Sequence, residues 1–142
     1  MKEDIKVMIH EEICTYEVCK LAKEKGFPQH IGNDAYIVEN EYDDEYEVGF
    51  HYPIQFIPDY LPTITAPTQS LLQRWLREEK NVQIIIKPTL DKLGAWIWGH
   101  YSWVIFIFNE YRPIYYSIYN GDNSTYELAL EDALDYSLKN LV

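Results

Sequence analysis

The sequence has no long apolar run and few cations, and each shortage excludes a class of protein. The longest continuous apolar stretch, Val104–Phe108, is far too short to span a bilayer, and the charged N-terminus, Met1–Asp4, leads into no apolar run of signal-peptide length. We therefore expect a cytoplasmic protein with no membrane partner. Lys and Arg number 12 against 23 Asp and Glu, and the net charge of -11 opposes phosphate backbones, so direct nucleic-acid binding is not expected either.

Motifs for catalysis, metals and cofactors are also missing. The two cysteines, Cys14 and Cys19, have the spacing of neither a C-x-x-C redox pair nor a zinc pair, which favours reduced structural thiols. All six glycines are isolated, so there is no phosphate-binding loop, and His10 lacks the second histidine of an HExxH site. No spacing singles out a pair of carboxylates for glycoside hydrolysis. We predict no catalytic residue, no cofactor and no metal, and the chain leans away from being an enzyme.

A change of hydrophobic period within Ala66–Lys87 marks the centre of the chain. Leu71, Leu72, Trp75 and Leu76 fall at helical spacing on one face, whereas Val82, Ile84 and Ile86 alternate as in a strand. The pattern predicts a helix that gives way to a strand at Asn81.

The C-terminal part predicts more strands and a final helix. Trp96–Phe108 is a long strand candidate, apolar on both faces in its second half, which is typical of a strand covered on both sides. A homodimer is one arrangement that would cover the second face. After a loop at Thr89–Gly94 and a turn at Asn109–Pro113, we expect a third strand at Ile114–Tyr119, broken by Asn120–Asn123. Ser124 with Glu127 forms a capping box for a helix whose stripe runs from Tyr126 to Leu141.

The N-terminal part predicts a strand at Ile5–Ile9 and a helix over Tyr16–Lys25. Thr15 is its N-cap, and Gly26 with Phe27 is typical of a Schellman stop. The expected fold class is α+β: an antiparallel sheet, with a three-stranded C-terminal meander and further strands near the N-terminus, packed with about three helices. We expect a single domain, 1–142, in which 68–142 forms a helix-strand-strand-strand-helix core and 29–67 is irregular, acidic and proline-rich.

The irregular part contains the candidate partner-binding residues. Six acidic side chains lie within nine residues with no cation among them. Without these six, the other 17 acidic and 12 basic residues would give the chain a net charge of only -5. The six are Glu39, Glu41, Asp43, Asp44, Glu45 and Glu47. Tyrosines interrupt the run, which favours the tip of a hairpin between Tyr36–Val38 and Val48–Tyr52. The prolines that follow, from Pro53 to Pro67, predict an extended arm packed over the surface by its apolar side chains.

Two blocks carry a resemblance to known sequences. APTQSLLQRWLREEKNVQIII from Ala66 and STYELALEDAL from Ser124 resemble a group of short uncharacterised proteins of gut Bacteroidales bacteria and their phages and mobile elements. The resemblance implies an origin and no activity.

Three functions follow from these observations. The first is a non-enzymatic phage or mobile-element accessory protein that binds an unidentified protein partner, since acidic and aromatic residues are abundant. The second is an acidic inhibitor that mimics nucleic acid. The third is a small hydrolase without a recognisable motif.

Overall fold

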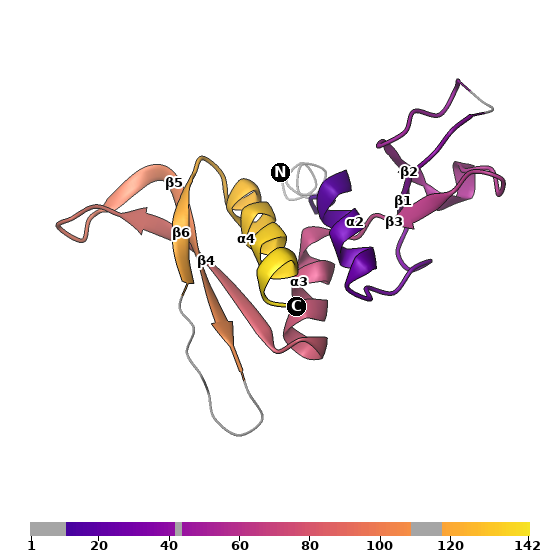
Figure 1. Cartoon of the computed structure of the whole chain (residues 1–142). Coiled ribbons are helices and arrows are strands. Elements are labelled where there is room, and N and C mark those ends of the chain that lie inside the picture. Colours follow the sequence, from indigo (N-terminus) through magenta and orange to yellow (C-terminus); the bar gives the residue numbers. More distant parts are fainter. Residues whose placement is uncertain (1–10, 42–43, 109–117) are drawn as a thin grey trace, which may run out of the picture.

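The computed structural model describes residues 11–41, 44–108 and 118–142, and it places helices between two antiparallel sheets (Figure 1). The fold is α+β, as the sequence predicts. In chain order the elements are α2 (Tyr16–Glu24), β1 (Asp34–Ile37), β2 (His51–Pro53), the 3₁₀ turn η1 (Ile54–Phe56), β3 (Thr63–Thr65), α3 (Gln69–Glu79), β4 (Val82–Leu90), β5 (Trp96–Ile107), β6 (Ile118–Asn123) and α4 (Tyr126–Asn140). The predicted strand Ile5–Ile9 lies outside the described residues.

Helix α2 begins and ends at the predicted signals. The Thr15 hydroxyl accepts a hydrogen bond from the Val18 amide at 3.4 Å, which satisfies one of the free donors of the first turn. At the other end Gly26 has a φ of 95°, the Phe27 amide donates to the Ala22 carbonyl, and the Gly26 amide donates to Lys23. These two bonds form the Schellman motif, and they direct the Phe27 ring into the core.

The change of period at Asn81 is confirmed. Helix α3 begins after Thr68, whose hydroxyl accepts from the Leu71 amide at 3.2 Å, and it ends at Glu79. Asn81 then takes a left-handed conformation, with a φ of 57°, which asparagine tolerates better than most residues. This turn sends β4 back along α3, so that the buried faces of both elements meet the same core.

Strand β5 lies at the centre of the sheet β4-β5-β6, and both neighbours are antiparallel to it. The third strand ends later than predicted. Strand β6 runs through Ile118–Asn123, so the predicted break at Asn120–Asn123 is wrong, while 114–117 lie outside the described residues. Pairing with β5, for example Asn120 with Trp103, overrides the turn preference of these polar residues. The loop after β4 also begins later than predicted, at Asp91.

The two faces of this sheet differ. Trp103 and Ile105 of β5 are buried under α4, and the Trp103 Nε1–H donates to Asp132 Oδ2 at 2.8 Å. On the opposite face Val104 is half-buried and its cross-strand neighbour Ile85 is exposed. The prediction that both faces of the strand are covered therefore holds fully for one face only, within the described residues.

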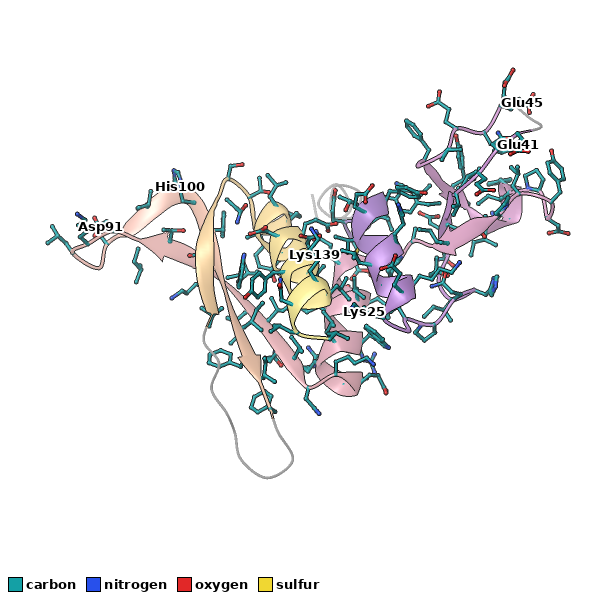
Figure 2. The ribbon with its side chains drawn as sticks, viewed as in Figure 1. Lys25, Glu41, Glu45, Asp91, His100 and Lys139 are labelled. Atoms are coloured by element: carbon teal, nitrogen blue, oxygen red, sulfur yellow. The ribbon has the colours of Figure 1, made fainter. Side chains whose placement is uncertain are left out.

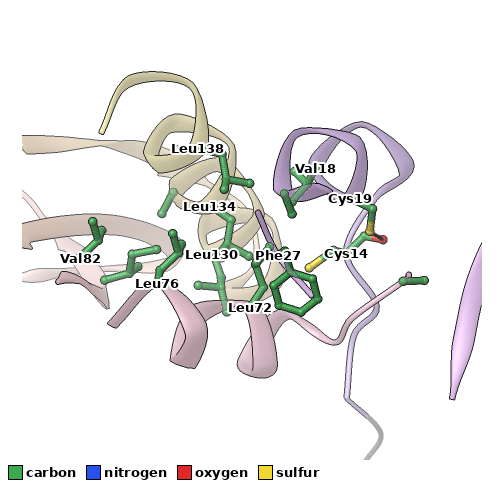
Figure 3. Packing of buried hydrophobic residues seen from close by; sticks show 14 of the residues in the cluster. Cys14, Val18, Cys19, Phe27, Leu72, Leu76, Val82, Leu130, Leu134 and Leu138 are labelled. Atoms are coloured by element: carbon green, nitrogen blue, oxygen red, sulfur yellow. Dashed lines mark hydrogen bonds between the residues drawn. The ribbon is translucent and has the colours of Figure 1, made fainter. Parts of the chain in front are cut away.

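Helix α4 completes the core, although its cap is not the predicted one. The Thr125 hydroxyl accepts from the Leu128 amide at 3.1 Å, so Thr125 is the N-cap, and the Ser124–Glu127 capping box is wrong. Figure 3 shows Leu130, Leu134 and Leu138 of α4 facing Leu72 and Leu76 of α3, with Val18 of α2 nearby. Tyr126, placed at the start of the predicted stripe, is instead largely exposed.

Residues 29–67, which we call the lobe, are not irregular as predicted. They form a second three-stranded antiparallel sheet, in the order β2-β1-β3. Pro53 is tolerated because β2 is an edge strand, where a missing N–H donor breaks no ladder bond. The lobe extends from α2 on the side opposite the β4-β5-β6 sheet (Figure 1).

Candidate partner-binding site

The predicted acidic residues lie together at the outer end of the lobe. They occupy the connection from β1 to β2, so the predicted hairpin is confirmed. Five of the six are described, and all five are exposed: Glu39, Glu41, Asp44, Glu45 and Glu47. Asp43 lies outside the described residues. Figure 2 shows Glu41 and Glu45 at the tip of the lobe, at the opposite end of the molecule from Asp91.

Hydrogen bonds within the connection hold its base. The Ile37 amide donates to the Phe50 carbonyl at 3.2 Å, and the Gly49 amide donates back to Ile37 at 2.8 Å. Gly49 has a φ of 81°, a left-handed conformation that glycine adopts without strain, so the position favours glycine. Further out, the Tyr46 and Tyr52 rings pack edge to face with centroids 5.5 Å apart. The carboxylates thus project from an ordered base.

Large aromatic side chains are exposed on the same lobe as the carboxylates, and one of them, Tyr60, lines a hollow together with Glu39 and Glu41. The predicted packing of the proline-rich arm is correct for Leu61 and Ile64, which are buried, but wrong for Phe56 and Tyr60, which are 63% and 61% exposed. The short turn η1 interrupts the extended arm at Phe56, and none of its residues is buried. On the hairpin, Phe50 is 56% exposed. Three exposed aromatic side chains on one lobe are more typical of a contact surface than of a free surface.

The charge of this region has one sign. The sequence from 26 to 73 contains no Lys or Arg and eight Asp or Glu, so most of the net charge of -11 belongs to it. A hollow of about 190 Å³ near the tip is lined by Glu39, Glu41, Tyr60, Leu61 and Pro62. Carboxylates beside a tyrosine ring are a favourable environment for a basic side chain.

The lobe is joined to the helices through Tyr36 of β1. Its hydroxyl donates to the Cys14 carbonyl at 2.6 Å, and its ring packs edge to face on Tyr16 and on His51. Burial raises the pKa of Tyr36 above its usual value, with smaller contributions from nearby Cys19 and Cys14. The phenol therefore stays a hydrogen-bond donor, and it fixes the lobe on α2. His51 is in turn oriented by Asp34, whose Oδ2 lies 3.3 Å from His51 Nδ1.

The cysteines are structural, as the sequence predicts. Both are buried and free, and the Cys19 thiol donates to the Cys14 carbonyl at 3.7 Å. A hydrogen bond with Cys19, together with burial, raises the pKa of the Cys14 thiol. The thiolate that nucleophilic catalysis needs is therefore disfavoured at Cys14.

The described histidines form no metal-binding group. His30 and His51 lie in the lobe, His100 lies in β5, and His10 lies outside the described residues. Across residues 11–41, 44–108 and 118–142, no group of three His, Cys, Asp or Glu is placed to hold a metal ion. Within the same ranges, no helix combines the length and the apolar character needed to cross a bilayer.

A second carboxylate site, which the sequence did not indicate, lies where three helices begin. Glu131 Oε1 accepts from the Thr15 amide at 2.7 Å, and Glu131 Oε2 accepts from Gln69 Nε2 at 2.8 Å. The same amide group of Gln69 also donates to the Glu127 carbonyl. These bonds tie α2, α3 and α4 together, so Glu131 already has structural partners. The two partners of Glu131 lie 116 and 62 residues away in sequence, which is why no local pattern predicts them.

The comparisons with known proteins add no relative: no protein-family model, no curated protein and no solved structure matches the chain.

Proposed function

We propose that the protein acts without catalysis, by binding another protein through the outer end of the lobe. The partner carries a basic surface. One observation carries this proposal: exposed aromatic rings and exposed carboxylates lie on the same lobe, in a sequence stretch that has no Lys or Arg. Aromatic rings supply buried area at a low entropic cost, while carboxylates steer a basic partner and exclude acidic ones.

The resemblance of the sequence suggests where such a protein works. Its two blocks favour an accessory protein of a phage or mobile element that acts in the cytoplasm of a gut bacterium. In that setting the partner is a protein of the host cell or of the element itself.

The aromatic side chains favour this function over mimicry of nucleic acid. A mimic presents carboxylates where phosphates would lie, and Phe50 and Phe56 have no counterpart in a phosphate backbone. A hydrolase is also less well supported. In the groove of about 620 Å³ beside α3, the two acidic residues already have partners: Glu11 accepts from the Ser70 hydroxyl at 2.8 Å, and Asp34 pairs with His51.

Affinity capture from a Bacteroidales lysate, followed by mass spectrometry, tests the proposal. The lobe variant carries Glu39→Gln, Glu41→Gln and Asp44→Asn. A matched control, Glu17→Gln, Glu24→Gln and Glu79→Gln, removes the same charge from exposed helical positions outside the lobe. We expect a basic partner that the control retains and the lobe variant loses, with affinity falling at least about tenfold and falling further with salt.

A third variant, Phe56→Ser, separates the two modes of binding. Loss of the partner in this variant, whose charge is unchanged, supports a mixed apolar and acidic interface. Full retention by Phe56→Ser, with loss in the lobe variant, would instead indicate a charge mimic. Capture of no partner, or equal capture by the lobe and control variants, would contradict the proposal.

A further inference from the structure

The β4-β5 hairpin extends beyond the rest of its sheet. Strand β6 pairs with β5 only from Tyr101 inward, so residues 88–100, which we call the distal hairpin, are a two-stranded ribbon within the described chain. Figure 1 shows this ribbon projecting from the body on the side away from the lobe. A two-stranded ribbon alone is marginally stable in water, and it gains stability from further strands or from packing of its face.

The apex of the distal hairpin presents a leucine on an ordered turn. Asp91 Oδ1 accepts from the Leu93 amide at 2.8 Å and from the Ala95 amide at 2.9 Å, and the Asp91 amide donates to the Ala95 carbonyl at 2.7 Å. Gly94 takes the left-handed conformation that the turn requires. Leu93 is 95% exposed at this apex. Because the turn is already ordered, docking of Leu93 would cost little conformational entropy.

The apolar exposure continues along the ribbon. Every residue described from Leu90 to Gly99 is exposed, and among the large apolar ones are Leu90 and Ile97. On the outer face of the adjoining sheet Ile85 is 45% exposed. Single exposed apolar residues are ordinary on a protein surface, but a group that lies along one projecting element is not.

The charge of the hairpin indicates which partner fits it. From Val82 to Phe108 the only charged residues are Lys87, Asp91 and Lys92, a net +1 in a chain of -11. Two copies of this chain are both negatively charged and repel one another, most strongly at their lobes, whereas the hairpins add no such repulsion. Because Asp91 and Lys92 are adjacent at the apex, a twofold axis there would bring opposite charges of the two copies near one another.

We propose that the distal hairpin is a self-association surface, on which a second copy of the chain docks through the same hairpin about a twofold axis. The two hairpins meet at their apices, with Leu93 of each copy at the centre. Pairing of the edges is disfavoured, because Pro88 removes a backbone donor from β4 and because β5 is irregular opposite it, with Gly99 at a φ of 76°. This surface is separate from the lobe and does not depend on the proposed function.

Sedimentation equilibrium of the full chain tests the proposal, with Leu93→Glu as the variant. Because Leu93 is almost fully exposed, its replacement does not disturb the core. Leu128→Glu is the matched control, since it places the same charge at an exposed leucine of α4. We expect wild type and control to form dimers at micromolar concentration, and Leu93→Glu to weaken the dimer at least about tenfold. High salt should leave the wild-type dimer intact, because the contacts between the hairpins are apolar and because salt screens the repulsion between the two negatively charged copies.

A distance measurement identifies the interface independently. A spin label at Ala95→Cys, an exposed position of the same turn, should give a short distance between copies, while a label at Leu128→Cys gives a longer one. The native cysteines are buried and do not compete for the label. A monomer at all concentrations up to about 1 mM, equal weakening by the two glutamate variants, or a short distance only at Leu128→Cys would each overturn the proposal.

Discussion

Replacement of Leu134 by alanine should test the central packing of the fold. Leu134 is fully buried on α4, in the core cluster that joins α2, α3, β4 and β5. The substitution keeps the helix, because alanine has the highest helix propensity, and it removes only the atoms that fill the core. Any loss of stability therefore reports on packing alone.

The magnitude follows from what is removed. Loss of three buried carbon atoms costs about 2.4 kcal/mol in transfer free energy, at about 0.8 kcal/mol for each. The surrounding side chains come from four different elements and relax only in part, so a cavity adds to this cost and brings the total to about 3–5 kcal/mol. A domain of this size has a free energy of unfolding of about 5–15 kcal/mol, and the variant should still fold.

Urea unfolding followed by circular dichroism measures the effect. With a slope of about 2 kcal/mol/M, the midpoint should fall by about 2 M, and the slope should not change. Leu128→Ala on the same helix is the control: Leu128 is 53% exposed, and its replacement should change stability by no more than about 0.5 kcal/mol. If the two variants unfold at the same urea concentration, α4 does not pack into the core through Leu134 and the packing argument fails.

Two further predictions address the helix cap and the buried thiol. Thr125→Ala should lower the free energy of unfolding by about 1 kcal/mol, whereas Ser124→Ala should have almost no effect. The reverse order in urea unfolding would show that Ser124 is the N-cap, as the sequence predicted. The pKa of the Cys14 thiol is raised in the folded state, so the unfolded chain loses the thiol proton at a lower pH than the folded chain does. The free energy of unfolding should therefore fall above about pH 8.5, by about 1.4 kcal/mol for each pH unit. Cys14→Ala should remove that part of the slope, and an unchanged alkaline slope in chemical unfolding between about pH 8 and 9.5 would refute it.

Elements with strong local signals could be predicted from the sequence. The caps of α2 and the turn at Asn81 are set by residues within one helical turn of each boundary, and the leucines of α4 repeat at helical spacing over fifteen residues. In such segments the side-chain pattern and the backbone preference agree, so little is left for tertiary contacts to decide.

Elsewhere long-range contacts decided the outcome. Ser124 and Thr125 are both good N-caps, and no local pattern separates them. Asn120 and Asn123 favour a turn, yet they pair with Trp103 and Tyr101 of β5, and β6 forms there. In the lobe, β2 and β3 are three residues long, which is too short for a period of two to be recognised.

The candidate site was predicted in its charge but not in its aromatic part. The acidic run is visible in the sequence because its six carboxylates are close in sequence. The exposure of Phe56 and Tyr60 is not visible in the sequence, because an aromatic residue between prolines is as typical of a core as of a contact surface. Only the fold of the lobe, in which η1 and the segment before β3 face solvent, separates these two alternatives.

The two proposals make a joint prediction, because the distal hairpin and the lobe lie at opposite ends of the molecule (Figure 2). A dimer formed at the hairpins leaves both lobes free and far apart. Two lobes on one particle bind a partner that has repeated basic sites more tightly than one lobe does, without any new contact. The monomeric Leu93→Glu variant should therefore bind a single site with unchanged affinity and lose affinity only for a repeated one. An equal loss for both partners would show instead that the hairpin takes part in binding itself.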